Sequence, residues 1–356
     1  MKQIAIIGGL GYVGLHLIEY LRESGDHITV FGRKNLEVLI EKSDNISVRT
    51  LNSIINNEKF DVVINLAYPS SYSRKKNFKD NINIVNTIYR ISRPGTIIIH
   101  TSTIAVFGTN LDYPIIRDKI NFRRDSHYTE VKIHIENLLQ KKFKGYSLHI
   151  IRLGNVWGPN SPGWVNQIAD RVLFQEPIPE SANSAPSNVS FVLNICDFIQ
   201  YLINNPEQGP KTFFHHFAEF GEITWGTIIN TLGKYLGEQP VFKPFQIFFP
   251  KSLGNELKQL INPITPRTVF YKMLGYRVLS SYAKSLVDLI PAKYRSDWKS
   301  NSSNKMVSKN VTDIVLSNQV LFKHSISAPW HPKYNFDEAF DLIKKSMIES
   351  GYIIKD

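Results

Sequence analysis

The chain has 356 residues, a formal net charge of +11 and a single cysteine, Cys196. Its content of 42% hydrophobic and 21% charged residues is typical of a globular protein, and the length suffices for two domains. One cysteine excludes an intramolecular disulfide, and no apolar run approaches the ~18–20 residues that span a bilayer. No secretory signal precedes the first predicted strand, so the sequence predicts a cytoplasmic protein.

Short aliphatic runs separated by helix-length segments recur through the first half of the chain. Apolar residues at helical spacing occur at 15–21 and 133–139, and the predicted strands lie at 4–7, 28–31, 61–66, 96–100 and 147–151. Continuous apolar strands are typical of a parallel sheet that is covered on both faces. We therefore predict an α/β fold with a Rossmann-type, doubly wound parallel sheet in residues 1–165.

The pattern changes after residue 165, which predicts a smaller C-terminal domain over 166–356. Residues 176–190 are rich in Pro, Ser and Asn and predict a loop. A short strand is expected at 191–195, followed by a helix to about residue 203, and mixed helices and loops are expected beyond 210.

Glycines at positions 8, 11 and 14 follow the first predicted strand and open the first predicted helix. Glycine lets the chain turn tightly and lets a pyrophosphate approach the backbone, and the helix start at Tyr12 and Val13 offers free N–H groups to that phosphate. A strand before the motif and a helix after it form the context of a dinucleotide site. The alternative is a glycine-rich turn without a ligand.

The end of the second predicted strand bears on the choice of cofactor. An acid at this point accepts hydrogen bonds from the ribose hydroxyls, whereas a basic residue accommodates a 2′-phosphate. This chain has Arg33 and Lys34 there and no acid. The sequence therefore favours NADP over NAD, and the alternative is a pair of solvated surface charges.

Tyr128 and Lys132 are four residues apart, so on a helix they lie on one face, one turn apart. A phenol has a pKa near ~10, and a nearby ammonium group lowers that pKa toward the range of a useful base. The pair follows, after about twenty residues, three consecutive hydroxyl side chains at 101–103 that leave the predicted strand at 96–100.

Taken together, these residues resemble the extended short-chain dehydrogenase/reductase family, which includes NAD-dependent epimerases, dehydratases and reductases. The resemblance covers about residues 3–240. The matching positions are Gly8, Gly11 and Gly14, the Leu66-Ala67 pair, Thr103 before Val106-Phe107-Gly108, Tyr128 with Lys132 and Glu136, and the stretch from Arg152 to Pro159 that contains Asn155, Val156 and Trp157.

The resemblance implies a division of roles among these residues. Thr103, Tyr128 and Lys132 would be catalytic, and Thr103, Asn155 and Trp157 would contact the substrate. Residues 1–165 would bind NAD(P) and residues 166–356 the substrate. The implied cofactor-binding residues are Gly8, Gly11, Tyr12, Val13, Gly14, Arg33, Lys34, Leu66, Ala67, Thr101, Tyr128, Lys132, Asn155 and Val156. No metal site is expected, because the ten histidines and one cysteine show no metal-binding spacing.

The residues after Thr103 limit the types of reaction that the chain can catalyse. Dehydratases of the family carry an acidic pair there, whereas this chain has Ile104 and Ala105, which cannot transfer a proton. Dehydration and oxidative decarboxylation are therefore disfavoured, and epimerisation and 4-ketoreduction stay open. An NADP preference favours reduction, while the frequency of epimerases in the family favours epimerisation.

The usual substrates of the family are nucleotide-activated sugars, which suggests a role in surface polysaccharide biosynthesis and, as in relatives, a homodimer. The arginine that grips the diphosphate in relatives has no clear counterpart. If Asp197 is the Asp that follows this arginine, Ser190 stands in its place; otherwise Asp197 is a helix-start acid. Two alternatives stay open: a lipid- or steroid-type hydroxy dehydrogenase, and a non-enzymatic dinucleotide-binding sensor or scaffold.

Residues 241–300 carry ten Lys and Arg against three acids, interleaved with aromatic residues. These residues are expected to cover the second domain with their charges in solvent. One alternative is peripheral contact with the inner face of the membrane, with a lipid-linked sugar as substrate. The other is nucleic-acid binding, which is disfavoured because the sequence contains no recognisable nucleic-acid-binding module.

Overall fold

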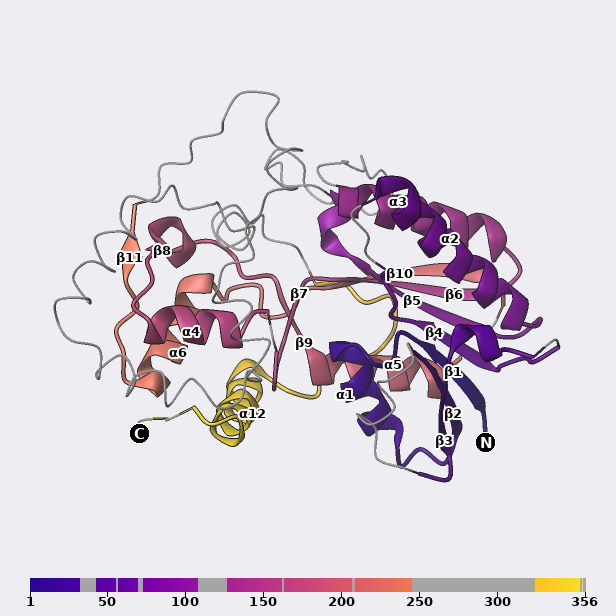
Figure 1. Ribbon diagram of the computed structural model, residues 1–356, viewed down its shortest axis with the longest axis horizontal. Coiled ribbons are helices and arrows are strands. Elements are labelled where there is room, and N and C mark those ends of the chain that lie inside the picture. Colours follow the sequence, from indigo (N-terminus) through magenta and orange to yellow (C-terminus); the bar gives the residue numbers. More distant parts are fainter. Residues whose placement is uncertain are drawn as a thin grey trace. The chain divides into compact units, whose positions relative to one another are not determined.

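The computed structural model describes residues 1–32, 43–55, 57–69, 73–107, 127–161, 163–206, 209–244, 324–352 and 354. The described residues fall into two units, and the division lies within the last helix, α12 (Phe336–Glu349). The first unit combines 1–161, 186–223 and 324–339, and the second combines 163–185, 224–244 and 340–354 (Figure 1).

The first unit is built on a seven-stranded sheet in which every strand pairing is parallel. The order across the sheet is β10-β6-β5-β4-β1-β2-β3. The strands are β1 (Gln3–Ile7), β2 (His27–Phe31), β3 (Ile46–Arg49), β4 (Val62–Asn65), β5 (Ile97–Thr103), β6 (Ser147–Leu153) and β10 (Lys211–Phe217). The Rossmann-type, doubly wound sheet predicted from the sequence is confirmed.

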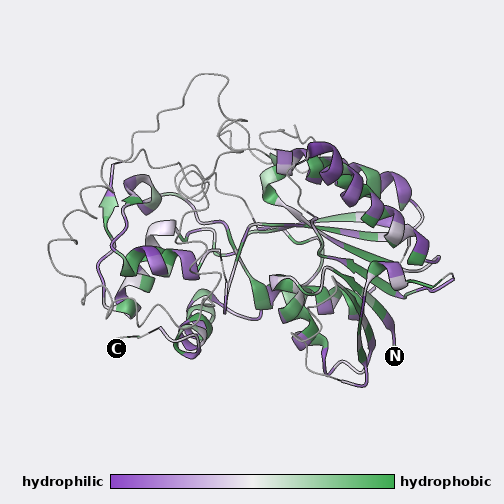
Figure 2. Ribbon diagram, in the orientation of Figure 1, coloured by the Kyte–Doolittle hydropathy of each residue, from purple (hydrophilic) through white to green (hydrophobic). Residues whose placement is uncertain are grey.

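Helices cover both faces of this sheet (Figure 1). On one face lie α1 (Tyr12–Leu21) and α5 (Val192–Asn204), and on the other lie α2 (Arg74–Ile91) and α3 (His127–Lys142). Each face buries a separate cluster of aliphatic and aromatic side chains. Figure 2 shows the same division, because the strands are mainly hydrophobic while the helices are hydrophobic on one side and hydrophilic on the other.

The two halves of the sheet bury different side chains. Strands β1 and β4 bury almost only Ile, Val and Ala. By contrast, β5, β6 and β10 also bury seven polar or charged side chains: His100, Thr101, Ser102, His149, Arg152, His215 and His216. We refer to β1, β2, β3 and β4 as the aliphatic half and to β5, β6 and β10 as the polar half.

The hydrogen bonds of the polar half fix the protonation of two buried histidines. The backbone N–H of Ser327 donates to Nδ1 of His215 at 3.2 Å, so His215 must carry its proton on Nε2. That Nε2 lies 3.1 Å from Nδ1 of His149, whose own Nε2 lies 3.1 Å from the hydroxyl of Ser147. Both rings are therefore neutral, and burial lowers the pKa of His149 to about 4 and that of His215 to about 3.

Residues 324–339 return to the first unit after the chain has passed through the second. Ser325 forms a bridge with His216 at the free edge of β10. Trp330 packs against Phe198 of α5 with ring centroids 5.0 Å apart and donates from Nε1 to Asp197 at 2.7 Å. Residues distant in the sequence thus complete one core.

Several expected elements differ from those observed. The strand predicted at 191–195 is wrong, because β9 (Val189–Phe191) pairs with β7 (Asn155–Trp157) and helix α5 begins directly at Val192. The interpretation of Asp197 as a helix-start acid is also wrong, because it lies in the second turn of α5 and accepts hydrogen bonds from Tyr20 and Trp330. The stretch beyond 210, predicted as helices and loops, begins with strand β10.

The described part of the second unit contains helices α4 (Asn166–Leu173) and α6 (Trp225–Leu236), the 3₁₀ helix η4 (Glu180–Asn183) and the part of α12 from residue 340 onward. Its short sheet pairs β8 (Ile178–Pro179) with β11 (Phe242–Lys243). The rings of Trp164 and Trp225 stack with centroids 4.9 Å apart, and α6 ends at Gly237 in the left-handed conformation, as is common for helix C-termini. All but the first four residues of the basic segment 241–300 lie outside the described residues. No described helix combines the length and hydrophobicity that a membrane span requires.

Candidate active site

The glycine turn leaves no room for side chains at two of its positions. A Cβ at Gly8, where φ is +83°, would lie 2.7 Å from the backbone nitrogen of Ala67. A Cβ at Gly14 would lie 2.3 Å from the carbonyl oxygen of Gly9. A Cβ at Gly11 would meet only the carbonyl oxygen of Gly8, at 3.4 Å, among the residues that the structure describes. The turn is thus tightly packed at Gly8 and Gly14 and open at Gly11.

Helix α1 begins beside this opening. Its N-cap residue is Gly11, and no described side chain caps it. The first N–H groups of a helix attract anions, so the turn has the form of a phosphate cradle. Tyr12 points its hydroxyl to the carbonyl oxygen of Pro159 at 3.0 Å, which ties the start of the helix to the 152–159 stretch. The residues that the sequence predicts for pyrophosphate binding therefore fit a dinucleotide.

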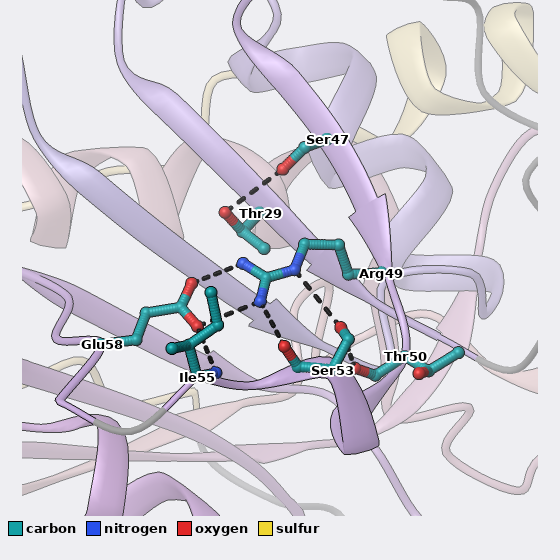
Figure 3. Close-up of polar contacts among 7 residues, drawn as sticks. All are labelled: Thr29, Ser47, Arg49, Thr50, Ser53, Ile55 and Glu58. Carbon is teal, nitrogen blue, oxygen red and sulfur yellow. Dashed lines mark hydrogen bonds and ion pairs between the residues drawn. The ribbon is translucent and has the colours of Figure 1, made fainter.

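The carboxyl ends of β2 and β3 lie side by side, because the two strands pair in parallel. The sequence predicts that the residues directly after β2 select between NADP and NAD. Arg49 at the end of β3 donates to both carboxylate oxygens of Glu58, at 2.5 and 3.1 Å, and to the hydroxyl and the carbonyl oxygen of Ser53 (Figure 3). Glu58 also accepts from the backbone N–H of Ile55 (Figure 3). This ion pair fixes the loop after β3. Arg33 and Lys34 lie outside the described residues, so the predicted NADP preference stays a prediction.

Thr103 and Tyr128 meet at the carboxyl end of β5. Thr103 is the last residue of the strand, and its hydroxyl is near enough to the phenol of Tyr128, the second residue of α3, to act on the pKa of that phenol. Although the side chain is partly exposed, burial raises the pKa of Tyr128 to about 12, against the opposing effect of the Thr103 hydroxyl. The phenol is thus protonated at neutral pH in the ligand-free chain.

Lys132 lies one helical turn from Tyr128, as the i, i+4 spacing predicts, and is 5% exposed. Its Nζ donates to the carbonyl oxygen of Thr101 at 2.9 Å and lies 5.9 Å from the centroid of the Tyr128 ring. Burial lowers the pKa of Lys132 to about 8, while the nearby Glu136 carboxylate acts to raise it. The three predicted catalytic residues are therefore brought together.

A buried ion pair supports the base of α3. Glu136 accepts from Arg152 of β6 at 2.7 and 3.2 Å and from the hydroxyl of Ser102 at 2.5 Å. Glu136 and Arg152 are at most 1% exposed. Because Arg152 also contacts Nε2 of His216 at 3.2 Å, this network joins α3 to all three strands of the polar half.

The other predicted site residues are placed less uniformly. Leu66 and Ala67 follow β4 and pass beside Gly8. Asn155 donates from its amide to the carbonyl oxygen of Ser187 at 2.7 Å. Trp157 is only 1% exposed and stacks on Phe336, so its predicted contact with substrate stays a prediction. Within the described residues, no group of three or more His, Cys, Asp or Glu is placed to hold a metal ion.

Tyr68 is a neighbour of the site that the sequence analysis did not single out. Its ring centroid lies 4.8 Å from that of Tyr128, in an edge-on arrangement, and Nζ of Lys132 lies 5.3 Å from its centre. The only sequence signal is a bulky aromatic residue directly after Leu66 and Ala67, in a segment without periodicity.

Comparison with protein families gives a match over more than half of the chain. The model of the NAD dependent epimerase/dehydratase family matches residues 4–212. A dTDP-D-glucose 4,6-dehydratase of Dictyostelium discoideum is 27% identical over 195 residues, which are 45% of this chain and 45% of that protein. UDP-glucuronic acid decarboxylase 4 of Arabidopsis thaliana is 24% identical over 235 residues, 58% of this chain and 52% of that protein. The matched region thus spans about half the length of these curated relatives.

Solved structures with this fold include two enzymes with low sequence identity. The Bordetella bronchiseptica enzyme WbmH, in complex with NAD+, superposes with a TM-score of 0.58 and 16% identity, covering 71% of this chain and 87% of that one. The UDP-glucose 4-epimerase of Thermotoga maritima, with UDP-glucose, gives a TM-score of 0.54 and 18% identity, covering 68% and 86%. At this identity the likeness shows the fold.

Proposed function

Because this chain belongs to the NAD-dependent epimerase/dehydratase family, we propose that it is an NAD(P)-dependent enzyme acting on a secondary alcohol or ketone of a nucleotide-activated sugar. The supporting observation is that Thr103, Tyr128 and Lys132 converge at the carboxyl end of β5. The glycine turn lies at the carboxyl end of β1 in the same sheet, and ligands of open parallel sheets bind at that edge.

Each group has a defined task in this proposal. The glycine turn and the start of α1 hold the pyrophosphate, and NAD(P) supplies hydride transfer at its nicotinamide when bound. Thr103 and Tyr128 hydrogen-bond the reacting oxygen of the sugar. Lys132, anchored on the carbonyl oxygen of Thr101, places a positive charge one turn from the phenol.

The protonation of Tyr128 favours one direction of proton transfer in the ligand-free chain. With a pKa of about 12, the phenol carries its proton and is suited to give it to a carbonyl oxygen. Taking a proton from an alcohol requires a lower pKa. The Thr103 hydroxyl acts in this direction, and Lys132, whose own pKa of about 8 leaves it mostly charged at neutral pH, would favour the phenolate further.

Epimerisation or 4-ketoreduction fits these residues better than dehydration. Although the curated relatives are a dehydratase and a decarboxylase, the residues after Thr103 are Ile104 and Ala105, which form a short 3₁₀ helix with no carboxylate. The proposed role in surface polysaccharide biosynthesis follows from the substrate class. Homodimerisation and membrane contact stay predictions, and the lipid-dehydrogenase alternative depends on a segment that lies outside the described residues.

The cofactor preference forms a separate part of the proposal. Arg33 and Lys34 favour NADP, whereas solved structures with this fold contain NAD, including WbmH with NAD+. If Arg33 binds the 2′-phosphate, Arg33→Ser weakens NADP binding about tenfold or more and leaves NAD binding unchanged, since a charge-assisted contact is worth roughly 1.5–3 kcal/mol. Equal loss for both cofactors contradicts the preference. Calorimetric titration with each cofactor measures it.

Turnover tests the enzymatic proposal directly. Purified protein is first assayed for retained cofactor by mass spectrometry, and then with UDP- and dTDP-hexoses and their 4-keto derivatives. Tightly retained NAD indicates an epimerase, whereas reversible NADPH binding indicates a reductase. Tyr128→Phe is expected to lower turnover by about 10²–10⁴ while cofactor binding is kept, because the proton-transfer group is lost. Tyr146→Phe, at a tyrosine beyond the end of α3, is the matched control. Unchanged turnover in Tyr128→Phe rejects the proposal.

A further inference from the structure

Tyr68 directly follows Ala67, which packs against the glycine turn, and the Tyr68 ring contacts the catalytic pair. Ala67 lies so close to Gly8 that a Cβ there would be 2.7 Å from the Ala67 nitrogen. Tyr68 meets Tyr128 with ring centroids 4.8 Å apart and planes at 77°. Edge-to-face pairs at this distance are attractive by about 0.5–1.5 kcal/mol, so Tyr68 restricts the orientations that the Tyr128 ring can adopt.

The same ring also lies beside the ammonium group of Lys132. Nζ is 5.3 Å from the centroid of Tyr68 and 5.9 Å from that of Tyr128, and it donates to the carbonyl oxygen of Thr101. A cation within ~6 Å of an aromatic ring is attracted by the ring quadrupole. The buried lysine therefore has one carbonyl and two aromatic rings around its charge.

Helix α2 holds the far end of Tyr68. The Asn77 amide donates to the Tyr68 hydroxyl at 3.1 Å and to Nε2 of His127, the residue before Tyr128, at 3.2 Å. Asn77 is 2% exposed, and its own Oδ1 accepts from the Asn81 amide at 2.8 Å, which fixes which end of the Asn77 amide donates. Tyr68 is thus fixed at its hydroxyl and at its ring.

We propose that Tyr68 is a positioning residue for the catalytic pair: its ring shields Lys132 and holds the phenol of Tyr128, and Asn77 fixes that ring. The proposal rests on the proposed roles of Tyr128 and Lys132, and it assigns Tyr68 no contact with substrate. In support, the Tyr68 phenol contributes to the raised pKa of Tyr128. The other described titratable groups around the pair are His100 on β5 and His127 and Glu136 on α3.

Two variants separate the ring from the hydroxyl. Tyr68→Leu removes the ring, so the pKa of Tyr128 should fall toward its ordinary value of ~10, and turnover at pH 7 should fall about tenfold or more because the reacting groups lose their alignment. Tyr68→Phe keeps the ring and loses the hydroxyl, together with its Asn77 contact and its direct effect on the Tyr128 pKa, so turnover is expected to stay within about threefold of the unmodified chain. The pKa is measured from phenolate absorbance, as the difference between each variant and the same variant carrying Tyr128→Phe, and from the pH profile of kcat.

Tyr89 offers a matched control at a distance from the site. Its ring packs edge-on against Phe143, Nζ of Lys142 lies 4.9 Å from its centroid, and it is 46% exposed. Tyr89→Leu removes the same kind of ring contact and should change neither the Tyr128 pKa nor the pH profile. An unchanged Tyr128 pKa in Tyr68→Leu overturns the proposal, as does a loss of turnover in Tyr68→Phe as large as that in Tyr68→Leu.

The absorbance titration needs no substrate, so it separates the two hypotheses. If no nucleotide sugar turns over, the proposed function fails, while the Tyr128 pKa in Tyr68→Leu still decides whether Tyr68 acts on the pair. If Tyr68→Leu does not fold, Tyr68→Met, which keeps much of the apolar volume without the ring, is titrated in its place with the same two outcomes.

Discussion

The aliphatic and polar halves of the sheet solve different physical problems. In β1 and β4, buried Ile and Val side chains supply the hydrophobic free energy, and the functional feature is a backbone turn that needs glycine at Gly8 and Gly14. In β5, β6 and β10, buried imidazoles and an ion pair must be matched donor to acceptor. The comparison teaches that the half that would bind the cofactor depends on backbone shape, whereas the half that carries Thr103 depends on fixed protonation states.

The largest expected effect breaks the buried ion pair of the polar half. Arg152→Met leaves the Glu136 carboxylate buried with the Ser102 hydroxyl as its remaining described donor, and losing one member of a buried pair costs about 3–5 kcal/mol. Ile64→Val in the aliphatic half removes one buried methylene and should cost about 0.5–1.5 kcal/mol. Urea unfolding of both variants measures the two values. Equal losses would mean that the halves do not differ as described.

Acid should destabilise the polar half nearly as strongly. Above pH 6.5, His149 and His215 are neutral in both the folded and the unfolded chain, so their effect is absent. Below pH 6.5 the two histidines bind protons in the unfolded chain, whereas in the folded chain they stay neutral down to about pH 4 or lower. The free energy of unfolding therefore falls as the pH falls. At pH 5 the loss is about 2 kcal/mol for each histidine, or about 4 kcal/mol for the two together, since both are neutral in the folded chain at that pH.

Denaturant midpoints at pH 7.5 and 5 measure this acid effect. His149→Gln is expected to reduce the difference between the two midpoints, because one proton-binding group is removed from the unfolded chain. His331→Gln, at an exposed histidine of the same unit, should leave the difference as it is in the parent chain. A difference that His149→Gln does not reduce contradicts the assignment of the acid effect to this pair.

A smaller effect is expected in the aliphatic half. Gly14→Ala places a Cβ 2.3 Å from the Gly9 carbonyl oxygen, so the turn must open and NAD+ binding should weaken about tenfold, or about 1.4 kcal/mol. Gly145→Ala, where a Cβ meets nothing described within 4 Å, is the control. Fluorescence titration with NAD+ measures the affinity of both variants. An unchanged affinity in Gly14→Ala would show that this turn does not bind the cofactor.

The smallest effect concerns the ion pair at the tip of β3. Arg49 and Glu58 are partly exposed, so Glu58→Gln should cost about 0.5–1 kcal/mol of unfolding free energy, more than the loss of a surface helix pair but far less than Arg152→Met. Asp80→Asn, which breaks the exposed i, i+4 pair with Lys76, should cost about 0.3–0.5 kcal/mol. If Glu58→Gln lowers the unfolding free energy more than Arg152→Met does, the expected difference between exposed and buried ion pairs is wrong.

The two halves also differ in how far the sequence predicts them. Strands β1, β2 and β4 of the aliphatic half were expected within one or two residues, as was β6 of the polar half, whereas α3 begins six residues before the apolar pattern at 133–139 that predicted it. β10 was not predicted, because Lys211, His215 and His216 interrupt its apolar pattern while pairing with β6 makes it a strand. Strand β3 is only four residues long, too short to show a clear period.

The site residues follow the same division. The i, i+4 spacing predicted that Tyr128 and Lys132 share one helix face, and the family resemblance implied that Thr103 joins them. Tyr68 and Asn77 could not be predicted, because the contacts of Tyr68 with Tyr128 and Lys132, and those of Asn77 with Tyr68 and His127, arise only when the segment after β4 packs with α2 and α3. The stacking of Trp157 on Phe336, about 180 residues later in the chain, could not be predicted either, and the predicted contact of Trp157 with substrate stays a prediction.

The late return of residues 324–339 has a consequence for synthesis on the ribosome. The edge of β10 that Ser325 caps, and the aromatic surface of Phe198 and Phe217 that Trp330 covers, are made roughly a hundred residues earlier. At ~5–20 residues per second, the nascent chain carries an open strand edge for roughly 5–20 seconds. Open edges invite pairing with other chains, so during this interval the nascent chain can associate with other chains at the edge of β10.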